Sequence, residues 1–447
     1  MSTKPQAGSV PAHLLELAER VEEAAADPRY APRKEMWTRH NRLEKVAKTP
    51  VYVCLKRGRG TNANPVTWSE LIPLDTRVST DPMESDIELQ MLQKLYKHDN
   101  IPDDEVLLPT IWIDPVRPVA GATGASGDPA QGDDTGGSSD FEGMDAKQAA
   151  RLWGLEFREV RSGDDPGSAY AVDPVVTTEA DLAKLKRPQF TIDKDATTER
   201  VERASELVGG RLPIALRLDE VGYAPTEVMI SLMGMEAVLY GVYDRPEFIH
   251  RIMEFITDAM IEYHLEREKA GGVDSEQTWG YRMPYEEIPT GADRYSLELG
   301  WASIAAQSMV GLSPAMYEEF AQPYHERLAQ VVSKDRIYYH GCEDLTKKLS
   351  IIRKLPNLRR FHISPWTDVE AAVDELGRDF VMEVVGHPDT LHVQTETEMR
   401  DWLERTMEIA GDSIFDLNLG EIETVFGDPS VLRRWAEIAQ DVAERYS

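Results

Sequence analysis

The stretch that decides the fold is RIYYHGCEDLTKKLSIIRKLPNLRRFHISPWTDVEAAVDELGRDFVMEVVGHPDTL, residues 336–391. Short apolar runs alternate in it with longer segments of helical periodicity. Apolar strands separated by helices are typical of a parallel sheet that is covered on both faces. We therefore expect strands over residues 336–340, 358–363 and 379–385, with helices over residues 344–354 and 366–376.

The same alternation extends outward over residues 201–447. Six or seven strands are expected between residues 211 and 420, and one from the N-terminal part brings the number to about eight. About eight strands alternating with helices predict an α/β fold, a (β/α)8 TIM barrel. A doubly wound open sheet is the alternative, but no glycine fingerprint follows a strand to favour it. The further expected strands cover residues 50–56, 105–114, 211–218, 272–279 and 412–417.

Composition divides the chain into three parts. We expect an N-terminal helical extension in residues 1–50, the first strand and a cap region in residues 51–200, and the main part of the barrel in residues 201–447. Within the cap, residues 120–145 are rich in glycine and acidic side chains and lack lysine and arginine. Because such a segment buries too little apolar surface to offset its ordering entropy, we expect a flexible acidic loop there.

The overall charge and the cysteine content exclude several classes of protein. The 49 basic and 79 acidic residues give a net charge of −30, which argues against nucleic-acid partners and against docking on an anionic membrane. With Cys54 and Cys342 as its only cysteines, the chain is no disulfide scaffold. The first residues lack the apolar segment of a signal peptide, and no apolar run approaches the roughly 18 residues of a membrane span. We therefore expect a cytoplasmic protein.

Polar side chains gather where the expected strands end, which is where barrel enzymes carry their chemistry. His340 and Cys342, two positions apart at one strand end, can lie on the same side of the chain. Imidazole and thiolate are good zinc ligands, and a catalytic zinc site needs a third protein ligand. The last expected strand and the loop after it offer Asp416, Asn418 or Glu421. The alternatives are a half-buried thiol beside a hydrogen-bonded histidine, or a Cys–His nucleophile pair.

Two acidic residues at other strand ends, Asp219 and Glu276, are candidates for general acids or bases. Alternatively, they form structural salt bridges with Arg217 and Arg282. Aromatic, basic and histidine side chains at the strand ends are candidates for holding a substrate or cofactor, although aromatic residues in a barrel mouth are as often plain packing. His362 is a weaker candidate of this kind. The candidates for binding are Tyr223, Trp279, Arg282, Trp366 and His387.

The C-terminal half carries several motifs in a characteristic order. They are Pro323–Tyr324 within SMVGLSPAMYEEFAQPYHERLAQVV (308–332), His340-x-Cys342, Trp366-x-Asp368, Gly386-His387-Pro388-Asp389, and LNLGEIETVFGDPSVL (417–432). In order and spacing they resemble the uroporphyrinogen decarboxylase superfamily over roughly residues 200–447. The resemblance implies a (β/α)8 barrel and one of two chemistries.

The first chemistry implied by the resemblance is methyl transfer. One branch of the superfamily consists of corrinoid- and thiol-linked methyltransferases, in which His-x-Cys and a later Cys hold zinc. His340 and Cys342 match this pattern, but the later Cys does not exist here, so a residue such as Glu421 would complete the site. The leading expectation is a zinc enzyme that moves a methyl group between a corrinoid protein and a small acceptor.

The second chemistry implied by the resemblance is decarboxylation without a metal. In that branch, arginines of an N-terminal signature hold the carboxylates of uroporphyrinogen. Arg57 and Arg59 stand at the corresponding place, and Asp219 would be the acid. The alternative expectation is therefore a metal-free decarboxylase or lyase of a carboxylated substrate. A third is a non-catalytic, corrinoid-binding partner subunit that keeps the barrel and has lost the metal.

Overall fold

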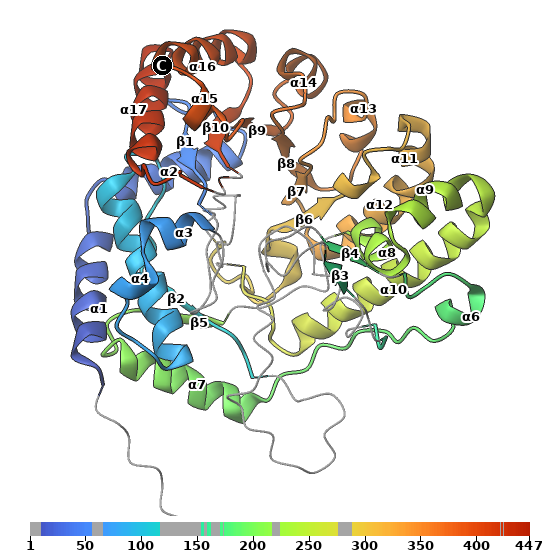
Figure 1. Ribbon diagram of the computed structural model, residues 1–447, viewed down its shortest axis with the longest axis horizontal. Helices are drawn as coiled ribbons and strands as arrows, with labels where there is room; N and C mark the ends of the chain where they lie inside the picture. Colours follow the sequence, from blue (N-terminus) through green and yellow to red (C-terminus); the bar gives the residue numbers. More distant parts are fainter. Residues whose placement is uncertain are drawn as a thin grey trace, which may run out of the picture.

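An arc of parallel strands with helices on its outer side forms the body of the protein (Figure 1). The computed structural model describes residues 10–55, 66–116, 153–155, 159–161, 170–172, 174–216, 224–275, 288–420, 422 and 424–447. In this part of the chain the largest sheet has six strands, all parallel, in the order β1-β10-β9-β8-β7-β6. These strands are β6 (Ala302–Ala305), β7 (Ile337–His340), β8 (Leu358–Ile363), β9 (Val381–Gly386), β10 (Phe415–Leu419) and β1 (Val51–Val53).

Helices follow most strands along the chain, as the alternation of the sequence predicts. Ser313 begins one of them as an N-cap, because its hydroxyl accepts a hydrogen bond from the N–H of Met316 at 3.3 Å. The sequence predicts a single helix from Ser313 to residue 334, but the structure divides it at Ala321 into two. The described helices from residue 225 onward are α8 (Pro225–Met233), α9 (Met235–Asp244), α10 (Pro246–Lys269), α11 (Pro314–Phe320), α12 (Gln322–Val332), α13 (Leu349–Ile352), α14 (Val369–Leu376), α15 (Thr390–Val393), α16 (Glu396–Ala410) and α17 (Ser430–Arg445).

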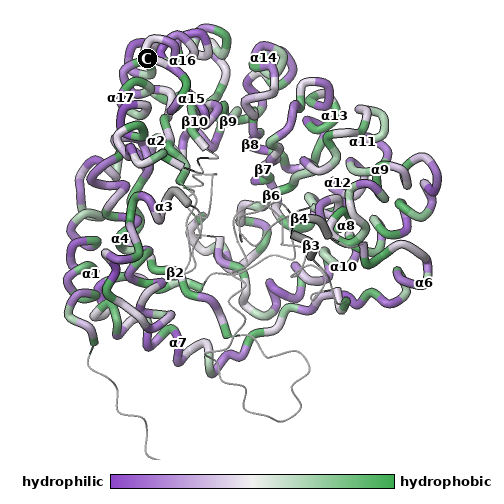
Figure 2. Tube along the Cα trace, viewed as in Figure 1, coloured by the Kyte–Doolittle hydropathy of each residue, from purple (hydrophilic) through white to green (hydrophobic). Residues whose placement is uncertain are grey.

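The two faces of the sheet belong to different cores. On β1, Val51 and Val53 join the large cluster that the outer helices cover, whereas Tyr52 and Cys54 join a second cluster with Tyr338 of β7. Successive side chains of a strand point to opposite faces, so this second cluster marks the concave side of the arc. Figure 2 shows hydrophobic and hydrophilic residues interleaved along α16 and α17, as expected for helices with one face on the sheet.

A separate parallel pair, β2 (Ile111–Ile113) with β5 (Ile214–Leu216), stands where the expected barrel would continue. The two sheets together have eight strands, each paired in parallel within its own sheet, but closure into an eight-stranded barrel is not seen in the described residues. The architecture is therefore α/β with a mainly parallel, six-stranded sheet.

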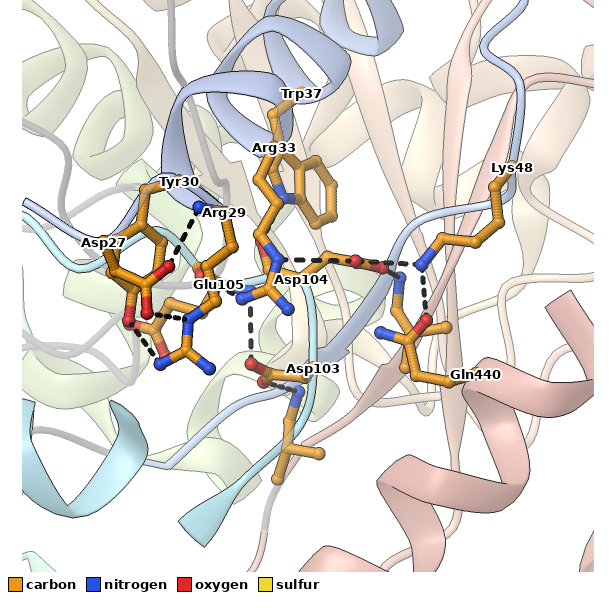
Figure 3. A network of polar contacts seen from close by, with 12 residues as sticks. Asp27, Arg29, Tyr30, Arg33, Trp37, Lys48, Asp103, Asp104, Glu105 and Gln440 are labelled. Carbon is orange, nitrogen blue, oxygen red and sulfur yellow. Dashed lines mark hydrogen bonds and ion pairs between the residues drawn. The ribbon is translucent and has the colours of Figure 1, made fainter. Parts of the chain in front are cut away.

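The free edge of β1 shows why the sheet ends there. The N–H groups of Val51 and Val53 donate to the carboxylates of Asp104 and Asp103, each at 2.8 Å. The carbonyl of Val51 accepts from the N–H of Asp104 at 2.8 Å, and that of Val53 accepts from Lys97 Nζ at 2.6 Å. These bonds satisfy the edge that a neighbouring strand would otherwise pair, and part of them is visible in Figure 3.

The strand expected over residues 272–279 is not present in its described portion. Residues 272–275 have no strand geometry, and residues 276–279 lie outside the described residues. Asp274 instead pairs with Arg294 at 2.6 Å, and the N–H of Ser275 donates to the carbonyl of Arg294 at 2.7 Å. The segment is bonded to the loop that precedes β6 rather than to a strand.

The N-terminal part is helical and packs beside β1 and β2. A short antiparallel pair, β3 (Glu159–Arg161) with β4 (Tyr170–Val172), lies in the expected cap region, while residues 120–145 lie outside the described residues. Among the described helices, none is long and apolar enough to cross a membrane. The remaining helices are α1 (Ala12–Ala25), α2 (Tyr30–Asn41), α3 (Val66–Leu71), α4 (Pro82–Asn100), α6 (Glu179–Leu182) and α7 (Lys194–Leu207), with single turns at Leu74–Thr76, Leu297–Leu299 and Gln307–Met309.

Candidate metal centre

Three potential metal ligands meet at the ends of two neighbouring strands. His340 is the last residue of β7, Cys342 follows it by two positions, and His362 stands on the adjacent β8. One ligand atom of each lies within 4.8 Å of the others, and His340 Nε2 is 3.1 Å from Cys342 Sγ. Both histidines are buried and Cys342 is half-buried. The cluster therefore has a ligand set and an accessibility that suit a metal ion.

The hydroxyl of Tyr338 determines which nitrogen of each histidine is protonated. Tyr338 donates its one hydroxyl proton to Glu383 Oε2. His340 Nδ1, at 3.2 Å from that hydroxyl, and His362 Nδ1, at 3.1 Å, must therefore donate to it or to the carboxylate. His362 Nδ1 is also 3.0 Å from Glu383 Oε2. This pattern leaves the Nε2 lone pairs of both rings available for a metal.

A buried arginine balances the carboxylates behind the histidines. Arg360 donates from Nη1 to Asp416 Oδ2 at 2.8 Å, and its Nη2 reaches Glu383 Oε1 at 3.4 Å. Burial acts to raise the pKa of Asp416, but the charge of Arg360 and a hydrogen bond from His40 outweigh it and hold the pKa below its usual value. Burial and the charge of Glu383 hold the pKa of Tyr338 far above its usual value, so its hydroxyl keeps its proton.

The structure describes two of the expected candidates for the third ligand, Asp416 and Asn418. The carboxylate of Asp416 is engaged by Arg360 and His40. Asn418 donates from Nδ2 to Glu383 Oε1 at 3.1 Å, and its buried Oδ1 has no hydrogen-bond partner among the described residues. Glu421 lies outside the described residues. His362, which the sequence marks only as a strand-end residue, is the third member of the cluster.

The donor set can be tested against the metal that the sequence predicts. Zinc binds cysteine sulfur and histidine nitrogen, and a catalytic zinc ion has three protein ligands and one open position. A zinc-binding histidine typically donates its other ring N–H to a carboxylate or a comparable acceptor, as His362 does toward Glu383. His340, Cys342 and His362 fit zinc on both counts.

Two of the expected binding residues lie close together beyond the strand ends. Trp366 is 60 % exposed, and its ring meets that of His387 edge to face at a centroid distance of 4.9 Å. Such an exposed aromatic side chain beside a half-buried histidine suits contact with a ligand. Eight other expected site residues lie outside the described residues: Arg57, Arg59, Asp219, Tyr223, Glu276, Trp279, Arg282 and Glu421.

Buried carboxyl groups near the cluster were not predicted from the sequence. Glu343 follows Cys342 directly, and both of its carboxyl oxygens are buried without a partner in the described structure. Burial raises the pKa of Glu343 to about 7, and the nearby carboxylate of Glu227 adds to this effect. Burial likewise raises the pKa of Glu227, whose carboxylate accepts a hydrogen bond from the N–H of Ser308. The sequence does not show that these two glutamates are buried, because most glutamates are exposed.

Comparison with known proteins bears on the C-terminal part of the chain. Residues 301–441 match the family model described as Uroporphyrinogen decarboxylase (URO-D), which confirms the resemblance over the segment that holds the cluster. No curated protein matches the chain. Among solved structures, a methyltransferase from Methanosarcina mazei is similar at 15% sequence identity with a TM-score of 0.49, covering 93% of this chain and 99% of that one.

Proposed function

From its uroporphyrinogen decarboxylase-like character, we propose that this protein is a zinc-dependent methyltransferase that acts on a small acceptor. The observation that supports this most directly is the cluster of His340, Cys342 and His362 at the ends of β7 and β8. Three donors of this kind leave one coordination position for a substrate. The cofactor is zinc rather than magnesium or calcium, because thiolate and imidazole are poor ligands for those hard cations.

Residues around the cluster have distinct tasks in this proposal. Bound zinc would act as a Lewis acid on the acceptor and favour its deprotonated form. Tyr338 and Glu383 engage the Nδ1 atoms of the histidines, so that their Nε2 atoms would bind the ion. Arg360 compensates the charge of Glu383 in the buried interior. Trp366 and His387 would contact the incoming substrate at the rim. Asp219 and Glu276 remain the expected proton carriers.

The methyl donor in this proposal is a corrinoid carried by a partner protein, as the family resemblance implies. In the transfer, the cobalt–carbon bond of the donor breaks and its electron pair stays on cobalt. A new bond forms between the methyl carbon and the acceptor atom, and the acceptor loses its proton. In a metal-free decarboxylase, Arg57, Arg59 and Asp219 would carry the reaction, and the cluster of His340, Cys342 and His362 would have no role.

The proposed function can be tested with methylcobalamin as donor and a small thiol as acceptor. We expect zinc-loaded wild-type protein to convert methylcobalamin to demethylated cobalamin, followed by its visible absorbance, and to methylate the thiol. Cys342→Ser should lose this activity because a hydroxyl stays protonated at neutral pH and binds zinc poorly. Cys54→Ser, which changes the other thiol of the chain, should keep it. Decarboxylation of uroporphyrinogen by the metal-free protein would contradict the proposal.

A further inference from the structure

A pocket of about 800 Å³, part of it open solvent, lies apart from the residues of the metal cluster. Its walls come from the N-terminal part of the chain: the start of α2, the middle of α4, the end of β1 and the segment that leads into β2. None of His340, Cys342 and His362 is among its lining residues. Its lining residues therefore need an explanation that is separate from the metal cluster.

Two buried hydrogen-bond donors line this pocket without partners. They are Trp68 Nε1 and Gln93 Nε2, neither of which has a hydrogen-bond partner in the part of the chain that the structure describes. Arg29 also lines the pocket, and its Nε pairs with Asp27 Oδ2 at 3.3 Å. Trp68 is 2 % exposed and Gln93 is 6 % exposed. Proteins rarely leave buried polar groups unpaired, so two unpaired donors around one pocket indicate an acceptor that is supplied from outside.

The charges around the pocket point to a negatively charged ligand. Four cationic side chains line it, Arg29, Arg33, Lys94 and Lys97, against the two carboxylates of Asp103 and Glu105. Those carboxylates are already engaged by Lys97 Nζ, at 2.7 Å and 2.9 Å respectively. Figure 3 shows the arginine side chains beside Asp103 and Glu105. Arg29 and Arg33 pair with Asp27 and Asp104, which do not line the pocket. The lining itself thus has an excess of positive charge, in a chain whose net charge is −30.

The rest of the lining is apolar and suits an organic ligand rather than a bare inorganic ion. Leu55, Ile101 and Val106 line it together with the indole rings of Trp68 and Trp112. Small-molecule pockets typically combine such apolar walls with a few convergent polar groups that fix the orientation of the ligand.

We propose that this pocket binds a small organic anion. Its carboxylate or phosphate oxygens accept hydrogen bonds from Trp68 and Gln93, the charge of Arg29 attracts them, and its apolar part lies against Leu55 and Ile101. Hydrogen bonds to a charged acceptor are the stronger kind, and the unpaired donors supply them without displacing an existing partner.

The first test uses 15N-indole-labelled protein and three probes: phenylacetate, phenyl phosphate and neutral phenylacetamide. We expect at least one anion to shift the indole N–H resonance of Trp68, assigned with Trp68→Phe, and to bind at least about tenfold more tightly than the amide. The preferred anion distinguishes a carboxylate from a phosphate ligand. Failure of both anions to shift this resonance at millimolar concentration would overturn the proposal.

The second test measures binding of the preferred anion to variants by calorimetry. Trp68→Phe and Gln93→Met should each weaken binding by at least about tenfold, since each removes one hydrogen bond to a charged group. Trp153→Phe is the matched control, because Trp153 is equally buried with an unpartnered indole N–H in the described structure but does not line the pocket. Cys342→Ser should bind normally, which separates this site from the metal centre. Unchanged binding in both pocket variants would contradict the proposal.

Discussion

At the scale of single residues, Arg360 is the charge on which the polar interior depends. Its side chain is fully buried between Asp416 and Glu383, the second of which supports the histidines. Removing one member of a buried ion pair leaves the remaining charge uncompensated, and this costs more than the pair contributes as a whole.

Arg360→Met is therefore expected to lower the free energy of unfolding by about 3–5 kcal/mol. The measurement is urea denaturation at pH 7. Arg359→Met is the matched control, because Arg359 precedes it on the same strand and its Nη2 lies 3.5 Å from the exposed Asp335. The control should cost less than about 1 kcal/mol. Equal losses in the two variants would show that Arg360 does not carry this role.

Glu227 gives a prediction about pH at the same scale. Burial raises the pKa of Glu227, and the hydrogen bonds from Ser308 only partly offset this. The folded state therefore holds the proton more tightly than the unfolded state does. The contribution of protonated Glu227 to the stability of the fold is fully present below the ordinary glutamate pKa. It is lost as the pH rises through the raised pKa of the folded state.

Glu227→Gln should accordingly gain in melting temperature relative to wild type as the pH is raised from 5 to 8. The amide keeps an acceptor for the N–H of Ser308 and never ionises. Glu236→Gln, on the exposed face of α9, is the control and should follow the wild-type pH dependence. If the melting temperature of Glu227→Gln varied with pH in parallel to that of wild type, the raised pKa of Glu227 would be contradicted.

At the scale of elements, the edge of β1 rests on side chains rather than on a neighbouring strand. Asp104 accepts the N–H of Val51 with one carboxylate oxygen and Lys48 Nζ with the other, at 2.9 Å. Loss of this carboxylate would leave a buried backbone N–H without a partner.

Asp104→Ala is expected to lower the free energy of unfolding by about 1–3 kcal/mol, the cost of one unsatisfied buried donor. Asp104→Asn should recover part of the loss, because its amide oxygen still accepts from Val51. Asp412→Ala is the control: Asp412 is exposed and pairs with the exposed Lys45. Denaturation curves in urea measure all three. Equal losses of stability in Asp104→Ala and Asp412→Ala would contradict the proposed role of Asp104 at this edge.

Much of this element order is predictable from the sequence, because periodicity reports which faces are buried. The strands over residues 337–340, 358–363 and 381–386 appear within a few residues of their expected positions. Periodicity does not report which edges pair. The bonds from Asp103 and Asp104 to β1 join residues about 50 positions apart, and no pattern in the sequence announces them. The division of the helix at Ala321 and the absence of a strand at residues 272–275 are likewise not predicted by periodicity.

At the scale of the whole molecule, the sheet brings together residues that the sequence keeps apart. His340 and Cys342 are recognisable as a pair because their spacing is local. His362 joins them only because β7 and β8 are neighbours with that register, and Glu383 because β9 follows next in the sheet. Candidate ligands can therefore be predicted from strand ends, but the choice among them needs the order of the strands.

The metal content of the purified protein tests the central claim most directly. After refolding with zinc and mild chelation, wild type should retain about one zinc per chain, as expected for a site with three protein ligands. Cys342→Ser and His362→Ala should each lose most of it, while Cys54→Ser should keep it, since Cys54 is not part of the described cluster. Wild-type protein that retains less than about a tenth of an equivalent under these conditions would contradict the account.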